Sequence, residues 1–157
     1  MFKRIFTVAA ACAWLVGCAH GYIAGTQVRN TPDNREILAV LDKAFTAMRA
    51  RDADALLALI SKRYFEDNGT ADQSDDYGYQ ELKDKVLPES MRLAKEFQID
   101  AEVQAVEVEG NVAYADLRYT SRVQLALPSG TKWHSTKEFD RVEFVREDGA
   151  WRIISGL

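Results

Sequence analysis

Apolar residues recur every three or four positions in the first half of the chain and predict two helices there. The apolar positions of the longer helix lie within residues 37–48, and those of the shorter one lie within residues 56–60. Thr31 and Pro32 fit the N-cap and first turn of the longer helix, because proline is tolerated where a backbone N–H has no helical partner. Asp52 fits the N-cap of the shorter helix. Both apolar faces are expected to pack into a core.

Polar residues separate these helices from a third helical stretch. A short strand is expected within residues 62–67, turned by Asn68-Gly69, and a polar loop then runs to Tyr77. The helical pattern returns over residues 80–97. Pro88 lies inside it, and because proline cannot donate to the helical ladder, it either kinks this helix or opens a second segment.

From Phe97 onward the apolar period changes to two, which is the period of a strand. Val106 and Val108 break the alternation of the first strand and indicate a bulge. Three long strands and a short final one are predicted. They are divided by turns at Gly110-Asn111, Pro128-Ser129-Gly130 and Asp148-Gly149.

The third long strand changes phase along its length. Trp133 and Phe139 share one face, whereas Val142 and Phe144 share the other, which predicts a second bulge. Helices followed by a meander of long, bent antiparallel strands are typical of an α+β fold. In this fold a strongly curved sheet wraps the N-terminal helices.

The first 17 residues have the composition of an export signal. Lys3 and Arg4 give a basic start, and an apolar run of residues 5–16 follows. This run is too short to span a bilayer, because a spanning helix needs about 20 apolar residues. Its length and flanks instead indicate a cleavable signal peptide.

The sequence Leu15-Val16-Gly17-Cys18 ends the apolar run and resembles the lipobox of bacterial lipoproteins. The resemblance implies cleavage between Gly17 and Cys18 and acylation of Cys18. Since Ala19 follows, it also implies a place in the cell envelope, on the periplasmic face of the outer membrane. An ordinary secretory cleavage at Ala11-Cys12-Ala13 is the alternative.

Cysteine use and charge agree with this interpretation. Cleavage would remove Cys12 and acylation would consume Cys18, so the mature chain would form no disulfide. The net charge is −4 and no basic cluster is present, so the membrane is the expected partner and nucleic acid is not. We expect a signal peptide over residues 1–17, a lipidated cysteine with a flexible tether over 18–30, and one domain over 31–157.

The opening helix pair, the long bent strands and the closing Gly149-Ala150-Trp151-Arg152-Ile153 are similar to those of the nuclear transport factor 2-like superfamily. That superfamily includes SnoaL-like and ketosteroid-isomerase-like proteins. The resemblance covers residues 33–155. It implies a cone with a pocket between the concave sheet and the helices, often dimerising through the sheet. Members include isomerases, dehydratases, cyclases and domains without known activity, so the fold alone determines no function.

Such a pocket would be lined mainly by apolar and aromatic side chains. Ordinary core packing is the alternative role for the same residues. Six residues are predicted to line the pocket: Phe45, Tyr64, Met91, Tyr119, Trp133 and Phe139.

Isomerases of the superfamily use a carboxylate base and an oxyanion donor such as a tyrosine. Asp140 is a candidate for the base, but no family motif assigns it this role, and a cross-strand ion pair on a solvent-exposed face is the competing interpretation. His134 is either a surface strand residue or a general base, because its pKa lies near neutrality. The candidate donors are Tyr64, Tyr77, Tyr79 and Tyr119.

An oxygen-rich loop offers a further interpretation. Asp67, Asp72, Asp75 and Asp76 supply the kind of oxygens that calcium takes, but their spacing is not that of an EF-hand, and an acidic surface loop is the alternative. No phosphate loop, nucleophile elbow or paired-cysteine zinc motif is present in the sequence. No cofactor is expected.

The leading hypothesis is a membrane-anchored periplasmic lipoprotein whose domain binds a small apolar ligand or a protein and does not catalyse a reaction. One alternative is an isomerase, dehydratase or cyclase that acts on a small substrate with a pocket carboxylate and a tyrosine. The other is a structural module of the cell envelope that pairs two copies through the sheet.

Overall fold

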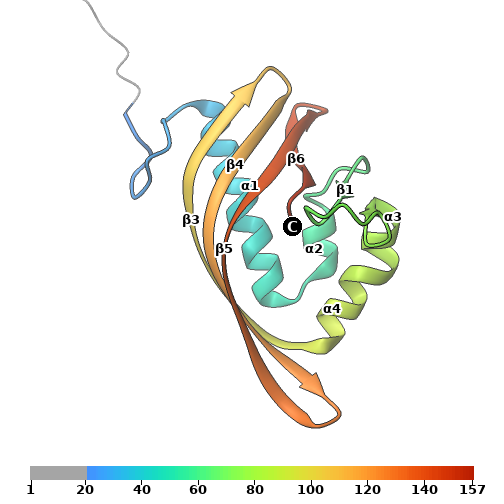
Figure 1. Ribbon diagram of the computed structural model, residues 1–157. Coiled ribbons are helices and arrows are strands. Elements are labelled where there is room, and N and C mark those ends of the chain that lie inside the picture. Colours follow the sequence, from blue (N-terminus) through green and yellow to red (C-terminus); the bar gives the residue numbers. More distant parts are fainter. Residues whose placement is uncertain (1–20) are drawn as a thin grey trace, which may run out of the picture.

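The computed structural model describes residues 21–157, so the predicted signal peptide and Cys18 lie outside the described residues. A four-stranded antiparallel sheet curves around the helices (Figure 1). The helical elements are α1 (Pro32–Ala50), α2 (Ala53–Leu57), α3 (Tyr79–Glu81), the π-helical turn η1 (Leu82–Val86) and α4 (Leu87–Leu93). The strands are β1 (Phe65–Glu66), β2 (Tyr77–Gly78), β3 (Ala94–Glu109), β4 (Val112–Leu127), β5 (Gly130–Glu147) and β6 (Ala150–Ser155).

The first two helices start at the predicted caps. The Thr31 side chain accepts a hydrogen bond from the backbone N–H of Asn34 at 3.1 Å, and Pro32 is the first residue of α1. The Asp52 carboxylate accepts one from the N–H of Ala55 at 2.9 Å and caps α2. Within the described residues, no helix has the length and apolar character needed to cross a bilayer.

The third helical stretch is shorter than predicted. It ends at Leu93, because Ala94 and Phe97 pair with Leu125 and Val123 of β4 and therefore belong to β3. Tertiary pairing thus overrides the local helical pattern in these four residues. Pro88 opens the segment α4, directly after the π-helical turn.

The sheet is a meander in the order β3-β4-β5-β6. The bulge predicted in the first strand is present, because the β3–β4 register shifts between Val103 and Ala105. The bulge predicted between Phe139 and Val142 is absent from the β4–β5 ladder, whose register is unbroken. The shift in β5 lies instead between Glu143 and Phe144, against β6.

The unbroken ladder decides which side chains of β5 face the helices. Val142 and Phe144 are buried, so the even-numbered residues of this strand lie on the inner, concave face. Trp133 and Phe139 therefore lie on the outer face, and Phe139 is 77% exposed. Two of the six predicted pocket residues thus point away from the helices.

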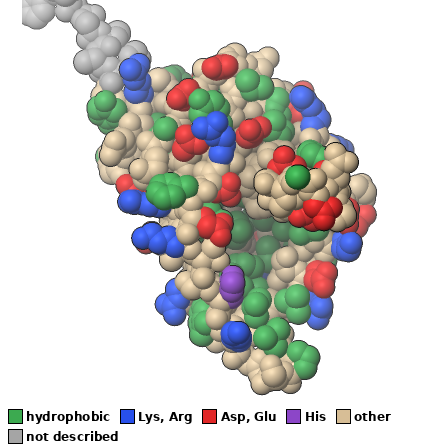
Figure 2. All heavy atoms as spheres, viewed as in Figure 1, with side chains coloured by type: hydrophobic (Ala, Val, Ile, Leu, Met, Phe, Trp, Pro, Cys, Tyr) green, Lys and Arg blue, Asp and Glu red, His purple; other side chains and the backbone are tan. Residues whose placement is uncertain are grey.

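The core lies between α1 and the concave face of the sheet. Ile37 and Ala44 of α1 are fully buried, as are Phe144 of β5 and Ile153 of β6. The far ends of β4 and β5 continue past α4 as an arm (Figure 1). Apolar side chains are visible in the hollow between this arm and the helices (Figure 2).

Residues 21–30, which belong to the predicted tether, form a hydrogen-bonded loop and not an extended chain. Tyr22 and Arg29 form an antiparallel bridge, and the N–H of Ile23 donates to the carbonyl of Val28 at 2.9 Å. The Val28 side chain is 2% exposed. The Asn34 side chain of α1 donates a hydrogen bond to the carbonyl of Arg29 at 2.8 Å, which connects the loop to the domain.

Candidate functional site

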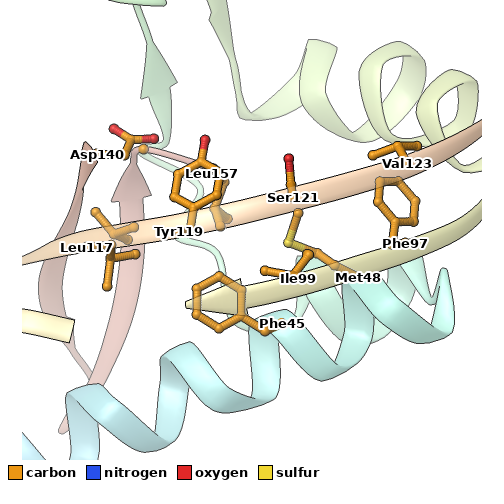
Figure 3. A pocket seen from close by; sticks show the side chains of 12 residues that line it. Phe45, Met48, Phe97, Ile99, Leu117, Tyr119, Ser121, Val123, Asp140 and Leu157 are labelled. Atoms are coloured by element: carbon orange, nitrogen blue, oxygen red, sulfur yellow. The ribbon is translucent and has the colours of Figure 1, made fainter. Parts of the chain in front are cut away.

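A cavity opens between α1 and the concave face of the sheet. Its other walls come from the first half of β3, the middle of β4, part of β5 and the two residues that follow β6. Its volume is about 150 Å³. Figure 3 shows Phe45 and Met48 of α1 on one side and the strand residues on the other. The wall is mostly apolar. Its lining residues are Phe45, Met48, Phe97, Ile99, Leu117, Tyr119, Ser121, Val123, Asp140, Val142, Gly156 and Leu157.

Local periodicity places the wall residues. Phe45 and Met48 stand next to the buried face of α1, where Ala44 packs into the core, so they are only partly buried and reach the cavity. Along β4, alternation turns every second side chain inward, and Leu117 and Tyr119 follow one another on that face.

Two polar groups stand at the wall on adjacent strands. Tyr119 lies opposite Glu138 in the β4–β5 register, and Leu117 lies opposite Asp140. In Figure 3 the Asp140 carboxylate and the Tyr119 hydroxyl point to the same side of β4. The Tyr119 hydroxyl donates a hydrogen bond to Oε2 of Glu138 at 3.2 Å.

The protein environment shifts the acidity of both groups. Loss of surrounding water raises the pKa of Asp140, and the negative charges of Glu66 and Glu138 raise it further, against a hydrogen bond from the backbone N–H of Arg141. Burial, together with the charges of Glu138 and Asp140, raises the pKa of Tyr119 to about 12. At neutral pH Tyr119 therefore keeps its proton and can donate it, and Asp140 is more basic than an ordinary aspartate.

A second cavity of about 420 Å³ adjoins the first. The two share Tyr119, Asp140, Gly156 and Leu157. The second cavity is polar, because most of its remaining lining residues carry charged or polar side chains. They come from β1, the loop after it, β5 and the end of β6. These remaining residues are Glu66, Asp67, Asn68, Gly69, Glu138, Phe139, Arg141 and Ser155.

Glu66 is held in place at this polar cavity. Its Oε2 accepts a hydrogen bond from the Tyr64 hydroxyl at 2.9 Å and another from the backbone N–H of Gly156 at 2.8 Å. The Tyr64 ring itself is 2% exposed and belongs to the core. Burial raises the pKa of Tyr64, so its hydroxyl keeps its proton and fixes Glu66.

The six predicted pocket residues therefore divide into three groups. Phe45 and Tyr119 line the apolar cavity. Tyr64 and Met91 pack in or against the core and do not reach the cavity wall. Trp133 and Phe139 do not line the apolar cavity, because the expected bulge is absent. Phe139 borders the polar cavity and a shallow pocket beside Asp116, and the Trp133 ring lies under the Arg122 guanidinium, whose carbon is 5.1 Å from the ring centre.

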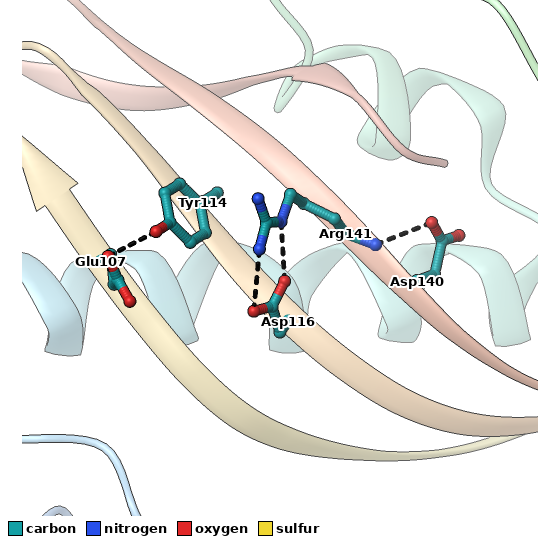
Figure 4. A network of polar contacts seen from close by, with 5 residues as sticks. All are labelled: Glu107, Tyr114, Asp116, Asp140 and Arg141. Atoms are coloured by element: carbon teal, nitrogen blue, oxygen red, sulfur yellow. Dashed lines mark hydrogen bonds and ion pairs between the residues drawn. The ribbon is translucent and has the colours of Figure 1, made fainter. Parts of the chain in front are cut away.

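The remaining catalytic candidates also separate. His134 is exposed on the arm, 3.1 Å from the Thr136 hydroxyl, and does not line the apolar cavity. Asp140 makes no cross-strand ion pair. On the outer face Arg141 binds Asp116 through two hydrogen bonds of 2.7 and 3.0 Å, as Figure 4 shows.

The four calcium candidates lie on one loop between β1 and β2. Within residues 21–157, no group of three or more acidic, histidine or cysteine side chains is arranged to hold a metal ion. Oxygens of the loop instead accept local hydrogen bonds: Asp67 from the N–H of Gly69, and Asp72 from the N–H of Ser74. The arrangement is that of an acidic surface loop.

Glu66 and Glu138 were missed by the sequence analysis. Glu138 could have been found by extending the phase of Val142 and Phe144 back along β5 without a bulge, because this puts Asp140 and Glu138 on the inner face. No sequence signal joins Glu66 to them. Its place depends on the contact between β1 and the end of the chain.

Comparisons with solved structures identify the fold. A conserved protein from Planctomyces limnophilus aligns with a TM-score of 0.66 at 17% identity, over 79% of this chain and 92% of that one. A nuclear transport factor 2-like superfamily protein from Salmonella enterica aligns with a TM-score of 0.62 at 14% identity, over 78% and 86%. The fold is that of nuclear transport factor 2-like proteins.

A structure with a named activity shares this fold. A type 2 hexachlorocyclohexane dehydrochlorinase aligns with a TM-score of 0.61 at 15% identity, over 79% of this chain and 82% of that one. At these identities the likeness concerns the fold alone. No family model matches the chain, and no curated protein matches it in sequence.

Proposed function

We propose that this protein is a cell-envelope lipoprotein whose domain binds a small, mainly apolar molecule in the cavity between α1 and β4. The observation that carries the proposal is the cavity itself, with walls of phenylalanine, methionine, isoleucine, leucine and valine side chains. The anchor would be the acylated Cys18 on the periplasmic face of the outer membrane, as the lipobox resemblance implies.

The size of the cavity bounds the ligand. An apolar protein cavity of about 150 Å³ is large enough to take a benzene molecule. The volume here is about 150 Å³, so the apolar part of the ligand would be a single aromatic ring or a branched alkyl group of similar size. Transfer of such a group from water into the cavity would supply the driving force.

Native mass spectrometry of the purified protein tests this function. The expected result is a co-purifying small molecule whose mass is lost from a Ser121→Trp variant, because Ser121 lines the cavity and an indole there would fill it. Thr120→Trp is the matched control, since Thr120 lies next to it in β4 and does not line the cavity. A ligand retained by Ser121→Trp would contradict the proposal.

A second candidate function is proton transfer on the bound molecule. Asp140 favours it, because a carboxylate with a raised pKa at the wall of an apolar cavity, on the strand next to a tyrosine, suits a general base. The dehydrochlorinase of the same fold is compatible with it. This candidate predicts that the bound molecule exchanges a carbon-bound proton with D₂O, and that Asp140→Asn stops the exchange while binding persists.

A further inference from the structure

The apolar cavity adjoins the acidic polar cavity, and the wall that they share is called the mouth below. Leu117 and Val142 belong to the apolar part, whereas Glu66 and Glu138 belong to the polar cavity that adjoins it. Asp140 lines both. A ligand that filled the apolar cavity would therefore present its outer end to three carboxylates.

These carboxylates have no basic partner within the described part of the chain. Glu66, Glu138 and Asp140 make no ion pair there with a lysine, arginine or histidine. Arg141 borders the polar cavity, but its guanidinium is bound by Asp116 and lies 4.0 Å from the centre of the Tyr114 ring (Figure 4). The cavity mouth thus carries negative charge that no basic side chain of residues 21–157 neutralises through an ion pair.

The other groups that face Asp140 add no positive charge. From β4 it meets Leu117 and Tyr119, from β5 it meets Glu138, and from β1 the charge of Glu66 acts on it. On the other side of the strand it shares a pocket with Gln104, Asp116 and Arg141, where the Arg141 guanidinium is bound by Asp116. The negative charges repel one another, and this repulsion becomes stronger as water is excluded. A bound cation would relieve this repulsion, whereas a bound anion would increase it.

We infer that the ligand is a small organic cation, namely an amine or amidine attached to one aromatic ring or a branched alkyl group of similar size. The inference rests on the proposed function, because it takes the apolar cavity as the site of the uncharged part. The ammonium would donate hydrogen bonds to Asp140 and Glu138 at the mouth. A metal ion does not fit, since the described residues form no group of three metal-ligating side chains.

Calorimetric titration of the purified protein with three matched probes tests the inference. The probes are phenethylamine, its uncharged analogue 2-phenylethanol and the anion phenylacetate. We expect phenethylamine to bind at least about tenfold more tightly than 2-phenylethanol, because hydrogen bonds to charged groups are the stronger ones, and phenylacetate to bind weakest.

The outcomes separate this inference from the proposed function. If 2-phenylethanol binds as tightly as phenethylamine, the cationic preference is overturned and the apolar binding function stands. If none of the three probes binds, both fail. A preference for phenylacetate would overturn the assignment of charge at the mouth.

Substitutions at the mouth locate the effect. Glu138→Gln and Asp140→Asn should each reduce the preference for phenethylamine and leave the affinity for 2-phenylethanol unchanged. Glu143→Gln removes a carboxylate from the outer face of the same strand and should leave both affinities unchanged. An equal loss in Glu143→Gln would mean that overall charge, and not the mouth, attracts the amine.

Discussion

Gly156 is the residue on which the cavity wall depends most directly. Its φ is +85°, a conformation that side chains rarely adopt, and it carries Leu157 into the cavity wall. A Cβ at this position would collide with the carbonyl oxygen of Arg141 and lie 2.9 Å from the Cα of Val142. Backbone conformation and lack of space therefore both require glycine.

Gly156→Ala should lower the free energy of unfolding by more than the strain of a positive φ alone, which is about 1–3 kcal/mol. Gly149→Ala is the matched control, because Gly149 has φ +81° and no atom within 4 Å of the added Cβ. Urea unfolding of both variants measures the difference. Equal decreases in the free energy of unfolding would show that the collision with Arg141 does not add to the destabilisation.

Asp140 gives a pH-dependent prediction at the same scale. Its pKa is raised in the folded protein, so the folded state binds the proton more tightly than the unfolded chain does, and ionised Asp140 costs stability at neutral pH. Asp140→Asn should therefore raise the melting temperature at pH 7. The gain should shrink as the pH falls through the raised pKa, because Asp140 is then protonated in the wild-type protein and its unfavourable charge is lost there too.

Thermal melts over a pH series measure this gain. Asp116→Asn provides the contrast, because Asp116 binds the Arg141 guanidinium and its loss should lower the melting temperature at pH 7. A gain for Asp140→Asn that stays constant with pH would disprove the electrostatic explanation.

At the scale of elements, α1 links the stability of the domain to the geometry of the cavity. Its buried face packs on the sheet, and Phe45 and Met48 on its flank form one side of the cavity. The helix starts at the Thr31 cap, where the side-chain oxygen satisfies a backbone N–H that has no helical partner.

Thr31→Ala should lower the free energy of unfolding by about 0.5–2 kcal/mol, because it removes this cap. Thr31→Ser keeps a hydroxyl at the same place and should stay close to the wild type. Urea denaturation compares the three proteins. A loss of equal size in the serine variant would assign the effect to the methyl group and not to the cap.

Two features belong to the scale of the whole molecule: the predicted anchor and the outer sheet face. The lipobox predicts that Cys18→Ser releases the protein from the membrane fraction or leaves its precursor uncleaved. Cys12→Ser should change neither result, because Cys12 would be removed with the signal peptide. Fractionation with immunoblotting measures both variants, and a wild-type protein that is itself found in the soluble fraction would favour the ordinary secretory cleavage.

The outer sheet face bears on the pairing of two copies. Phe139 is 77% exposed and Trp133 is 38% exposed on this face. Aromatic residues are enriched in protein–protein interfaces, so this face is a candidate for pairing. If copies pair through this face, Phe139→Asp should convert a dimer into a monomer. Light scattering measures the mass, and a wild-type protein that is monomeric at high concentration would end this interpretation.

Much of the fold follows from the sequence, because it depends on local physics. Thr31 and Asp52 mark helix starts through capping, and the hairpin turns at Gly110 and Gly149 use positive φ values. The alternation along β4 likewise predicts which of its residues face inward. These features need only neighbouring residues, so the order of helices and strands could be predicted without the tertiary structure.

The site was decided by the tertiary structure. Whether Asp140 or Phe139 faces the helices depends on the β4–β5 register, and a single-residue slip would exchange them. Glu66 is held at the mouth by the neighbouring Tyr64 hydroxyl and by the N–H of Gly156, which lies 90 residues later in the chain. By itself the sequence determined the order of helices and strands and the acidic balance, and it predicts the lipobox. Long-range pairing alone brought an apolar cavity and three carboxylates together, because no local pattern encodes contacts between distant strands.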